Sequence, residues 1–238
     1  MENTTKLLIN HTFCHLMLIP AFLYGELWMF VASFFWWYVV AIVAISGGYH
    51  RYYSHNSFKA GKWYPWAVNV LGMFAGAGPA MTWAATHRQH HAHSDTELDP
   101  HSHSVKGIWA VYVNTWGYGF KIKRRFIKRL LQDKVLRWFH KYYFHLNIAI
   151  IVVFTAIDPL FMIFGYAMPV VLAFHGYGIL NVLGHRGAQP NNSWVANILT
   201  AGEGWHRNHH RRAGSWAIGQ EWWQFDPTKW FIQLIKTN

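Results

Sequence analysis

The chain contains two nearly identical histidine pentapeptides, "HRQHH" starting at His87 and "HRNHH" starting at His206. On an α-helix, positions i, i+3 and i+4 point at about 0°, 300° and 40°, so each pentapeptide places three imidazoles on one face. With 17 histidines and one cysteine in 238 residues, a metal held here would be bound by nitrogen and oxygen. Imidazole alone does not choose between zinc, copper and iron.

Two further segments, "HRYYSH" and "NVLGH", add ligands of the same kind. His50 and His55 lie about 140° apart on an ideal α-helix, so the helix should bend or end there if both bind one centre. Asn181 and His185 are four residues apart and share a helix face. The combined set is too large for one ion and about right for two. It comprises His50, His55, His87, His90, His91, Asn181, His185, His206, His209 and His210.

Carboxylates are scarce around these histidines. Carboxylate-bridged di-iron bundles use an E-x-x-H motif on each of two helices plus two further glutamates. This chain has ten acidic residues and one such motif, Glu203 to His206. We therefore expect Glu203 to accept a hydrogen bond from His206 or a neighbour, not to bind metal. A structural zinc site would need only four ligands, and a membrane metal transporter would place its ligands at mid-membrane.

The remaining histidines have more ordinary interpretations. A lone buried histidine is usually a hydrogen-bonded core residue, which is our expectation for five of them. For three that follow the first pentapeptide we expect supporting or surface roles. The first group is His11, His15, His140, His145 and His175, and the second is His93, His101 and His103.

The elements that must position the histidines are membrane spans. Hydrophobic residues make up 53% of the chain and charged residues only 13%, about half the share typical of soluble domains. Two stretches of 44 residues, 7–50 and 142–185, contain no Lys or Arg. As helix each would extend about 66 Å, two crossings of a hydrocarbon layer about 30 Å thick. Breaks at Gly25–Glu26 and Asp158–Pro159 divide each stretch into a hairpin, so we predict an all-α membrane protein with four spans.

The topology follows from these hairpins. Each returns the chain to its starting side, so the basic segments share one face, which the positive-inside rule makes cytoplasmic. Residues 63–85 are apolar enough for a fifth span, which would separate the two pentapeptides. Their glycines and Pro79 favour instead a segment that lies in the interface or dips into it. We expect one domain, 1–238, with both termini and a helical cap that holds the site on the cytoplasmic side.

The order H-x-x-x-x-H, H-x-x-H-H, N-x-x-x-H, H-x-x-H-H resembles the membrane fatty acyl desaturases of the stearoyl-CoA 9-desaturase type, in a short, bacterial-like form. The resemblance runs from about residue 42 to residue 223 and includes "HRQHHAHSDTELDPHS" and "GEGWHRNHH". Related alkane hydroxylases and carotenoid or sterol oxygenases carry three boxes with other spacings and are the alternative.

The resemblance implies two iron ions bound by the nine histidines above, with Asn181 holding a metal-bound water. It implies dioxygen as co-substrate and a long-chain saturated acyl group that gains a cis double bond, at carbons 9 and 10. Asp95, Asp99 and Glu203 would then accept hydrogen bonds from the outer imidazole nitrogens. The other partners are the lipid bilayer and a ferredoxin or cytochrome b5-type donor, which the net charge of +11 and the run from Lys121 to Arg129 would attract. We expect no nucleic acid partner.

The acyl chain must pass the metals and run between the spans. Counting back from His50 on the second span, Ile42 lies about 12 Å and Tyr38 about 18 Å away along the axis. These distances match a chain with some nine carbons beyond the reacting bond. In the desaturases that this chain resembles, side chains at such positions form the tunnel floor. We therefore expect Tyr38 and Ile42 to line its end.

Overall fold

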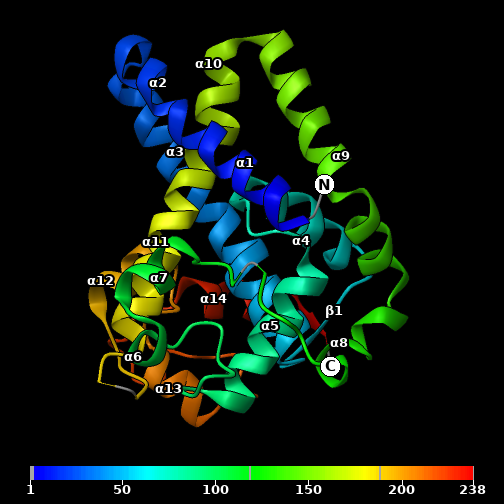
Figure 1. Cartoon of the computed structure of the whole chain (residues 1–238), viewed down its shortest axis with the longest axis vertical. Coiled ribbons are helices and arrows are strands. Elements are labelled where there is room, and N and C mark those ends of the chain that lie inside the picture. Colours follow the sequence, from blue (N-terminus) through cyan, green and yellow to red (C-terminus); the bar gives the residue numbers. More distant parts are fainter. Residues whose placement is uncertain (1–2, 118, 188, 238) are drawn as a thin grey trace.

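A computed structural model describes residues 3–117, 119–187 and 189–237. Long helices occupy one end of the molecule and a cap of short helices and loops occupies the other (Figure 1). Among the described residues the only strands are a two-residue antiparallel pair, β1 (Lys59–Ala60) with β2 (Lys236–Thr237). The all-α fold predicted from the sequence is therefore confirmed.

The first hairpin breaks where the sequence predicts. Helices α1 (Asn3–Leu16) and α2 (Leu18–Tyr24) make the first span, and α3 (Leu27–Val40) continues into η1 (Ala41–Ser54) as the second. Gly25 and Glu26 stand between α2 and α3 in extended backbone. Near-uniform apolarity along α3 is what a helix surrounded by lipid and protein requires.

The second hairpin also breaks where predicted. Helix α9 (Lys134–Ile157) ends at Asp158, whose carboxylate accepts a hydrogen bond from the backbone N–H of Leu160 and caps α10 (Pro159–Met162). The chain then continues through η4 (Ile163–Ala167) into α11 (Met168–Gly184). Four helices of the described chain are long and apolar enough to cross a membrane, and we describe the protein as integral to it.

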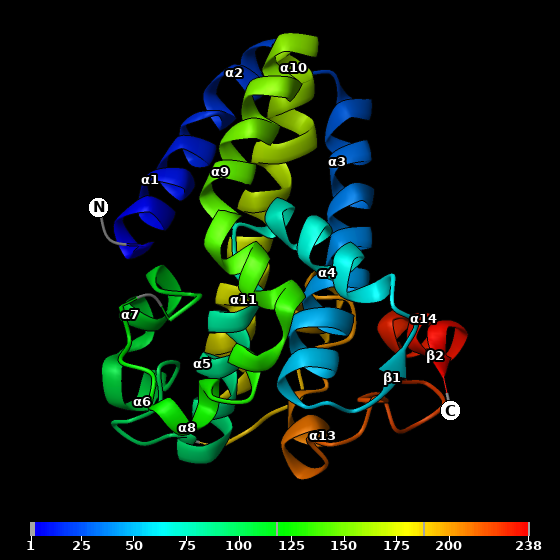
Figure 2. The same cartoon turned by 90° about the vertical axis from the view of Figure 1, so that its right-hand side faces the viewer.

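Residues 63–85 do not form a fifth span. They fold as α4 (Tyr64–Gly72) and η2 (Met73–Ala75), and a turn leads into α5 (Ala80–His93). Gly76 and Gly78 adopt φ values of +62° and +79°, which side chains rarely tolerate, and they let the chain reverse. Helix α4 lies across the spans and α5 runs down into the cap (Figure 2). Both pentapeptides therefore lie at the same end of the bundle.

The end of the second span is a π-helix, η1, and not an α-helix. A π-helix closes hydrogen bonds between residues five apart, so residues at that spacing lie nearly above one another. The backbone N–H of His55 donates to the carbonyl of His50 at 3.1 Å, and η1 ends at Ser54. The wider turn reduces the angular separation of about 140° that an ideal α-helix would impose on these two histidines.

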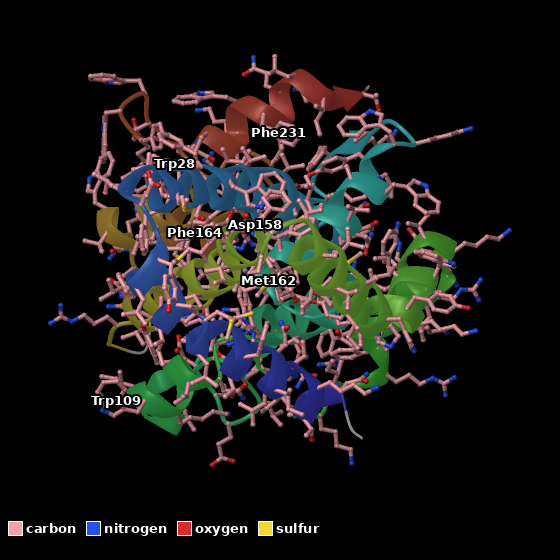
Figure 3. The ribbon with its side chains drawn as sticks, turned by 90° about the horizontal axis from the view of Figure 1, so that it is seen from above. Trp28, Trp109, Asp158, Met162, Phe164 and Phe231 are labelled. Atoms are coloured by element: carbon pink, nitrogen blue, oxygen red, sulfur yellow. The ribbon has the colours of Figure 1, made fainter. Side chains whose placement is uncertain are left out.

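The cap is assembled from the segments between and after the spans (Figure 2). Several of its short helices expose apolar side chains: Trp109, on α7, is 78% exposed and points away from the bundle (Figure 3). Exposed tryptophans beside membrane spans are typical of the bilayer interface. The cap elements are α6 (His103–Lys106), α7 (Ile108–Val113), α8 (Arg124–Ile127), η3 (Leu130–Gln132), α12 (Trp194–Leu199), α13 (His206–Arg211) and α14 (Pro227–Ile235).

Candidate metal centre

Nine histidines gather into two neighbouring groups beneath the spans. Within each group, one ring nitrogen from every member lies within 4.8 Å of the corresponding nitrogens of the others. Cluster A consists of His50, His55, His87, His91 and His209, and cluster B consists of His90, His185, His206 and His210. These are the nine histidines that the sequence singles out, and the structure brings all of them together.

Each pentapeptide contributes to both clusters. On α5, His87 and His91 belong to cluster A and His90 belongs to cluster B. On α13 the assignment is reversed: the outer two histidines belong to cluster B and His209 belongs to cluster A. Helices η1 and α11 bring the remaining members from the spans. The two clusters are therefore interlocked.

The imidazoles face one another through their Nε2 atoms. His209 Nε2 lies 2.9 Å from His50 Nε2 and 2.8 Å from His91 Nε2. In cluster B, His206 Nε2 lies 2.8 Å from His185 Nε2 and 3.1 Å from His210 Nε2. Each Nε2 carries either one proton or one lone pair in the ring plane, so these distances restrict the protonation of the whole set.

Carboxylates fix the tautomers of three of these rings. Asp99 Oδ1 lies 2.8 Å from His90 Nδ1, and Asp95 Oδ2 lies 3.2 Å from His185 Nδ1. A carboxylate oxygen of Glu203 contacts His50 Nδ1. A neutral imidazole that donates from Nδ1 presents a lone pair at Nε2. Three Nε2 lone pairs therefore point into the clusters.

Protons alone cannot satisfy these contacts. The Nε2 proton of His209 can reach His50 or His91 but not both, while His50 is held as an acceptor. In cluster B, His206 must donate to His185, so its contact with His210 either opposes two protons or leaves the His210 lone pair facing a proton that is already used. A cation that accepts all the lone pairs of a cluster removes the conflict. The donor set thus fits one metal ion in each cluster, as the sequence predicts.

The pKa values agree with a ligand role. Burial, followed by the neighbouring His90 and His185 imidazoles, lowers the pKa of His210 to about 2. Burial likewise holds the pKa values of His206 and His209 well below the usual range. These rings are therefore neutral at pH 7, the form that binds metal. Burial alone would raise the pKa of Glu203, but the adjacent His50 and Arg51 lower it to about 2, so this acceptor is ionised.

Asn181 lies beside cluster B. Its amide Nδ2 donates to the carbonyl of Thr115 at 2.9 Å, which directs Oδ1 away from that contact. Together with His90 and His185, Asn181 lines a cavity of about 30 Å³. This volume accommodates a water-sized ligand.

The same cavity has aromatic and apolar walls that the sequence interpretation did not include. The ring of Trp83 stacks on His87, with centroids 5.1 Å apart and planes 13° apart. Trp116, Tyr177 and Leu180 complete these walls. Trp83 precedes His87 by four residues, and Tyr177 precedes Asn181 by four. Helical spacing from the ligands could have identified both residues.

The structure places Glu203 beside a neighbour of His206 and not beside His206 itself. The motif assumes a helix, but α13 begins only at His206, and Gly202 adopts a φ of +113°. The turn carries Glu203 across to η1, where it accepts from Ser46, contacts His50 Nδ1 and forms an ion pair with Arg51. Its partner is therefore His50, while His206 Nδ1 is buried with no hydrogen-bond partner in the described chain.

Arg51 is an unpredicted buried charge next to the site. Its guanidinium is 1% exposed and lies 3.2 Å from Glu203 Oε1 and 2.9 Å from Asp226 Oδ1. It also donates to the carbonyl of Trp216 at 2.8 Å. Asp226 begins α14 and accepts from the backbone N–H of Lys229. The ion pairs connect the second span, the turn before α13 and the C-terminal helix.

The expected tunnel residues lie on α3 and η1. Tyr38 is half-buried, with its ring stacked on Phe34 at 5.9 Å. Ile42 is also half-buried and packs against the main hydrophobic core. The neighbouring Trp37 is fully buried. Its ring centroid lies 6.2 Å from that of Tyr177, which belongs to the cavity wall.

The expectation of hydrogen-bonded core histidines holds for three of five. His11 Nε2 lies 3.0 Å from the carbonyl of Gly76, and His15 contacts His175, as expected of hydrogen-bonded core residues. His140 Nδ1 is buried with no hydrogen-bond partner in the described chain, and the expectation is wrong for His145, which is exposed on α9. His101 lines the cavity beside cluster B, and His93 contacts Arg125. The side chain of His103 lies outside the described part of the structure.

Comparison with known proteins identifies the same region. The fatty acid desaturase family model matches residues 26–233. The sn-1 stearoyl-lipid 9-desaturase of Anabaena variabilis is 31% identical over 234 residues, which is 89% of this chain and 86% of that protein. The acyl-CoA C20 Delta5-desaturase of Anemone leveillei is 32% identical, over 86% of this chain and 73% of that protein. The Delta-9 acyl-lipid desaturase 1 of Arabidopsis thaliana is 29% identical, over 84% of this chain and 71% of that protein.

Proposed function

Because this chain belongs to the fatty acid desaturase family, we propose that it introduces a cis double bond between carbons 9 and 10 of a saturated long-chain acyl group. The convergence of nine imidazoles in two clusters beneath apolar spans carries the proposal. The acyl group is linked to CoA or to a glycerolipid, since relatives of similar identity carry names of both kinds. Two of the three relatives named above act at position 9.

The centre would hold two iron ions, one bound by cluster A and one by cluster B. When bound, the irons supply the activation of dioxygen. Overall, one dioxygen, two electrons, two protons and two hydrogens from adjacent methylenes become two waters, and the acyl chain gains one double bond. The protein's own groups position and shield this chemistry. Asp95, Asp99 and Glu203 hold the imidazoles in orientation, and Asn181 holds a water beside cluster B.

The reacting part of the acyl chain would lie against the apolar walls of the cavity, next to its water-sized space and not inside it. Trp83, Tyr177 and Leu180 offer aromatic and aliphatic surface next to the histidines. Exclusion of bulk water protects a strongly oxidising centre from side reactions. The rest of the chain would run between the spans toward Tyr38 and Ile42. The site and both termini would face the cytoplasm, where an acidic ferredoxin or cytochrome b5-type protein supplies electrons.

The decisive experiment is expression in a host whose own desaturase has been deleted. Gas chromatography of fatty acid methyl esters should show a new monounsaturated acid, and mass spectrometry of its disulfide adduct should place the double bond at carbon 9. A double bond at carbon 5 would show that the proposed position, between carbons 9 and 10, is wrong. Hydroxylated chains with no alkene would instead favour the related membrane hydroxylases.

Replacing Asp99 by Asn tests the orienting carboxylates. A neutral amide oxygen accepts the His90 Nδ1 proton more weakly than a carboxylate does, so the bond that directs His90 Nε2 toward cluster B loses its charge assistance. We expect iron affinity to fall about 10- to 100-fold, the usual effect of losing such a partner. The measurement is iron retained per chain during titration with a chelator. Glu97→Gln on the exposed loop nearby is the control, and equal iron loss in both variants would contradict the prediction.

Replacing Tyr38 by Ala tests the tunnel floor. Removing the phenol should open the end of the tunnel, so the product spectrum should shift toward longer acyl chains while the double bond keeps its distance from the carboxyl end. Fatty acid analysis of cells fed mixed chain lengths measures this shift. Trp37→Phe is the comparison, because Trp37 contacts the cavity wall. A shift in the Trp37 variant alone would place the floor at Trp37.

A further inference from the structure

The histidine centre has two different faces. Five of its rings line the small cavity that also contains Trp83, Tyr177 and Asn181. Three other rings are absent from that lining and are partly exposed at the molecular surface: His55, His91 and His210. One face of the centre therefore meets apolar protein, and the other meets solvent.

The exposed rings form a continuous row across both clusters. The centroids of His55 and His91 are 4.6 Å apart, and those of His91 and His210 are 4.3 Å apart. His91 and His210 are stacked with planes 20° apart, although His91 belongs to cluster A and His210 to cluster B. A partner at this surface would thus be in van der Waals range of rings from both clusters.

Basic side chains flank the row on two sides. Arg211 and Arg212 directly follow His210 and are exposed. At the end of α5, the His93 ring contacts Lys123 Nζ at 3.4 Å and Arg125 at 3.0 Å. Helix α8, which carries Arg125, packs against α5. The three elements α5, α8 and α13 lie together at the end of the molecule opposite α2 and α10 in both views (Figures 1 and 2).

We propose that this row is the electron-entry face: an acidic one-electron carrier docks over His55, His91 and His210, between Arg211–Arg212 and Lys123–Arg125. The inference rests on the proposed function, since each double bond consumes two electrons, delivered by two successive carrier molecules that are each oxidised by one electron. Charge complementarity argues for an acidic partner, because the chain carries a net charge of +11. The exposed ring edges shorten the path to both clusters, whereas substrate occupies the opposite, apolar face.

Charge reversal tests the location of docking. The variants are R211E/R212E and K123E/R125E, and the control is K59E/K62E, which changes net charge equally on exposed lysines at and just after β1. The probes are a plant-type ferredoxin and the soluble haem domain of cytochrome b5. Their binding to the protein in lipid nanodiscs is measured at several salt concentrations, with iron content recorded for each variant.

We expect the two row variants to bind the probes about tenfold more weakly, with a flatter salt dependence, while the control keeps native affinity. Equal weakening in the control would overturn the proposal, because net charge alone would then govern binding. Unchanged binding in both row variants would also overturn it. Desaturation driven by a chemical reductant is assayed in parallel. If the native protein makes no double bond under those conditions, the proposed function fails, whatever the binding result.

Discussion

An alanine in place of His206 will leave a protein that inserts in the membrane but makes no double bond. His206 Nε2 faces both His185 and His210 in cluster B, so its loss opens the ligand set of one ion. Insertion depends on the apolar spans and not on metal. We expect the same outcome at seven positions, measured as product per membrane-inserted chain together with iron per chain. They are His50, His87, His90, His91, His206, His209 and His210.

His145→Ala is the matched control for these variants. His145 is exposed on α9, outside both clusters, so its loss should leave iron content and product formation near native values. Native turnover in any of the seven variants would remove that histidine from the proposed ligands. Equal loss of activity in the control would show that the assay reports membrane insertion and not metal binding.

Replacing Asp226 by Ala should produce the largest loss of stability. Asp226 is 1% exposed and holds the Arg51 guanidinium, and it also accepts from the backbone N–H groups of Ile218, Gly219 and Lys229. Arg51 would keep Glu203 as its remaining carboxylate partner but lose the closer of its two ion pairs, and losing one partner of a buried ion pair costs about 3–5 kcal/mol. Thermal unfolding in detergent micelles measures the loss of stability. Protease sensitivity of the C-terminal segment reports whether α14 has detached.

Asp158→Ala provides a close comparison. Asp158 also precedes a proline and caps a helix, but it is exposed and has no ion pair with Arg51. Losing its cap should cost about 1 kcal/mol. If both variants lose the same stability, the loss at Asp226 reflects helix capping alone and the ion pairs with Arg51 contribute little.

The spans and their breaks were predictable because the membrane imposes a strong and simple constraint. A hydrocarbon layer excludes charge, so the stretches without Lys or Arg reveal the hairpins, and Asp158 and Gly25 mark the turns. That each pentapeptide places its three histidines on one helix face also followed from a local rule, the spacing of residues along an α-helix. These signals need no knowledge of tertiary contacts.

The partition of each pentapeptide between two clusters was not predictable from local pattern. Three histidines on one helix face are equivalent until a second helix approaches them, and only the packing of α5 against its neighbours separates His90 from His91. The π-helix at His50 likewise depends on tertiary structure. Arg51 and Asp226 lie 175 residues apart in sequence, and no periodicity connects them. The sequence left the partner of Glu203 open between His206 and a neighbour, because only the turn before α13 decides that it contacts His50.

The exchange of ligands between the clusters has the form of a pseudo-twofold relation. If the two clusters are exchanged, each histidine of the first pentapeptide takes the role of the histidine at the same position in the second. The pairs are His87 with His206, His90 with His209, and His91 with His210. Each half of the chain, a hairpin followed by a pentapeptide, builds one cluster and lends a single imidazole to the other. The metal centre is thus arranged like the interface of a dimer whose two protomers are joined in one chain, and neither half could complete its own cluster alone.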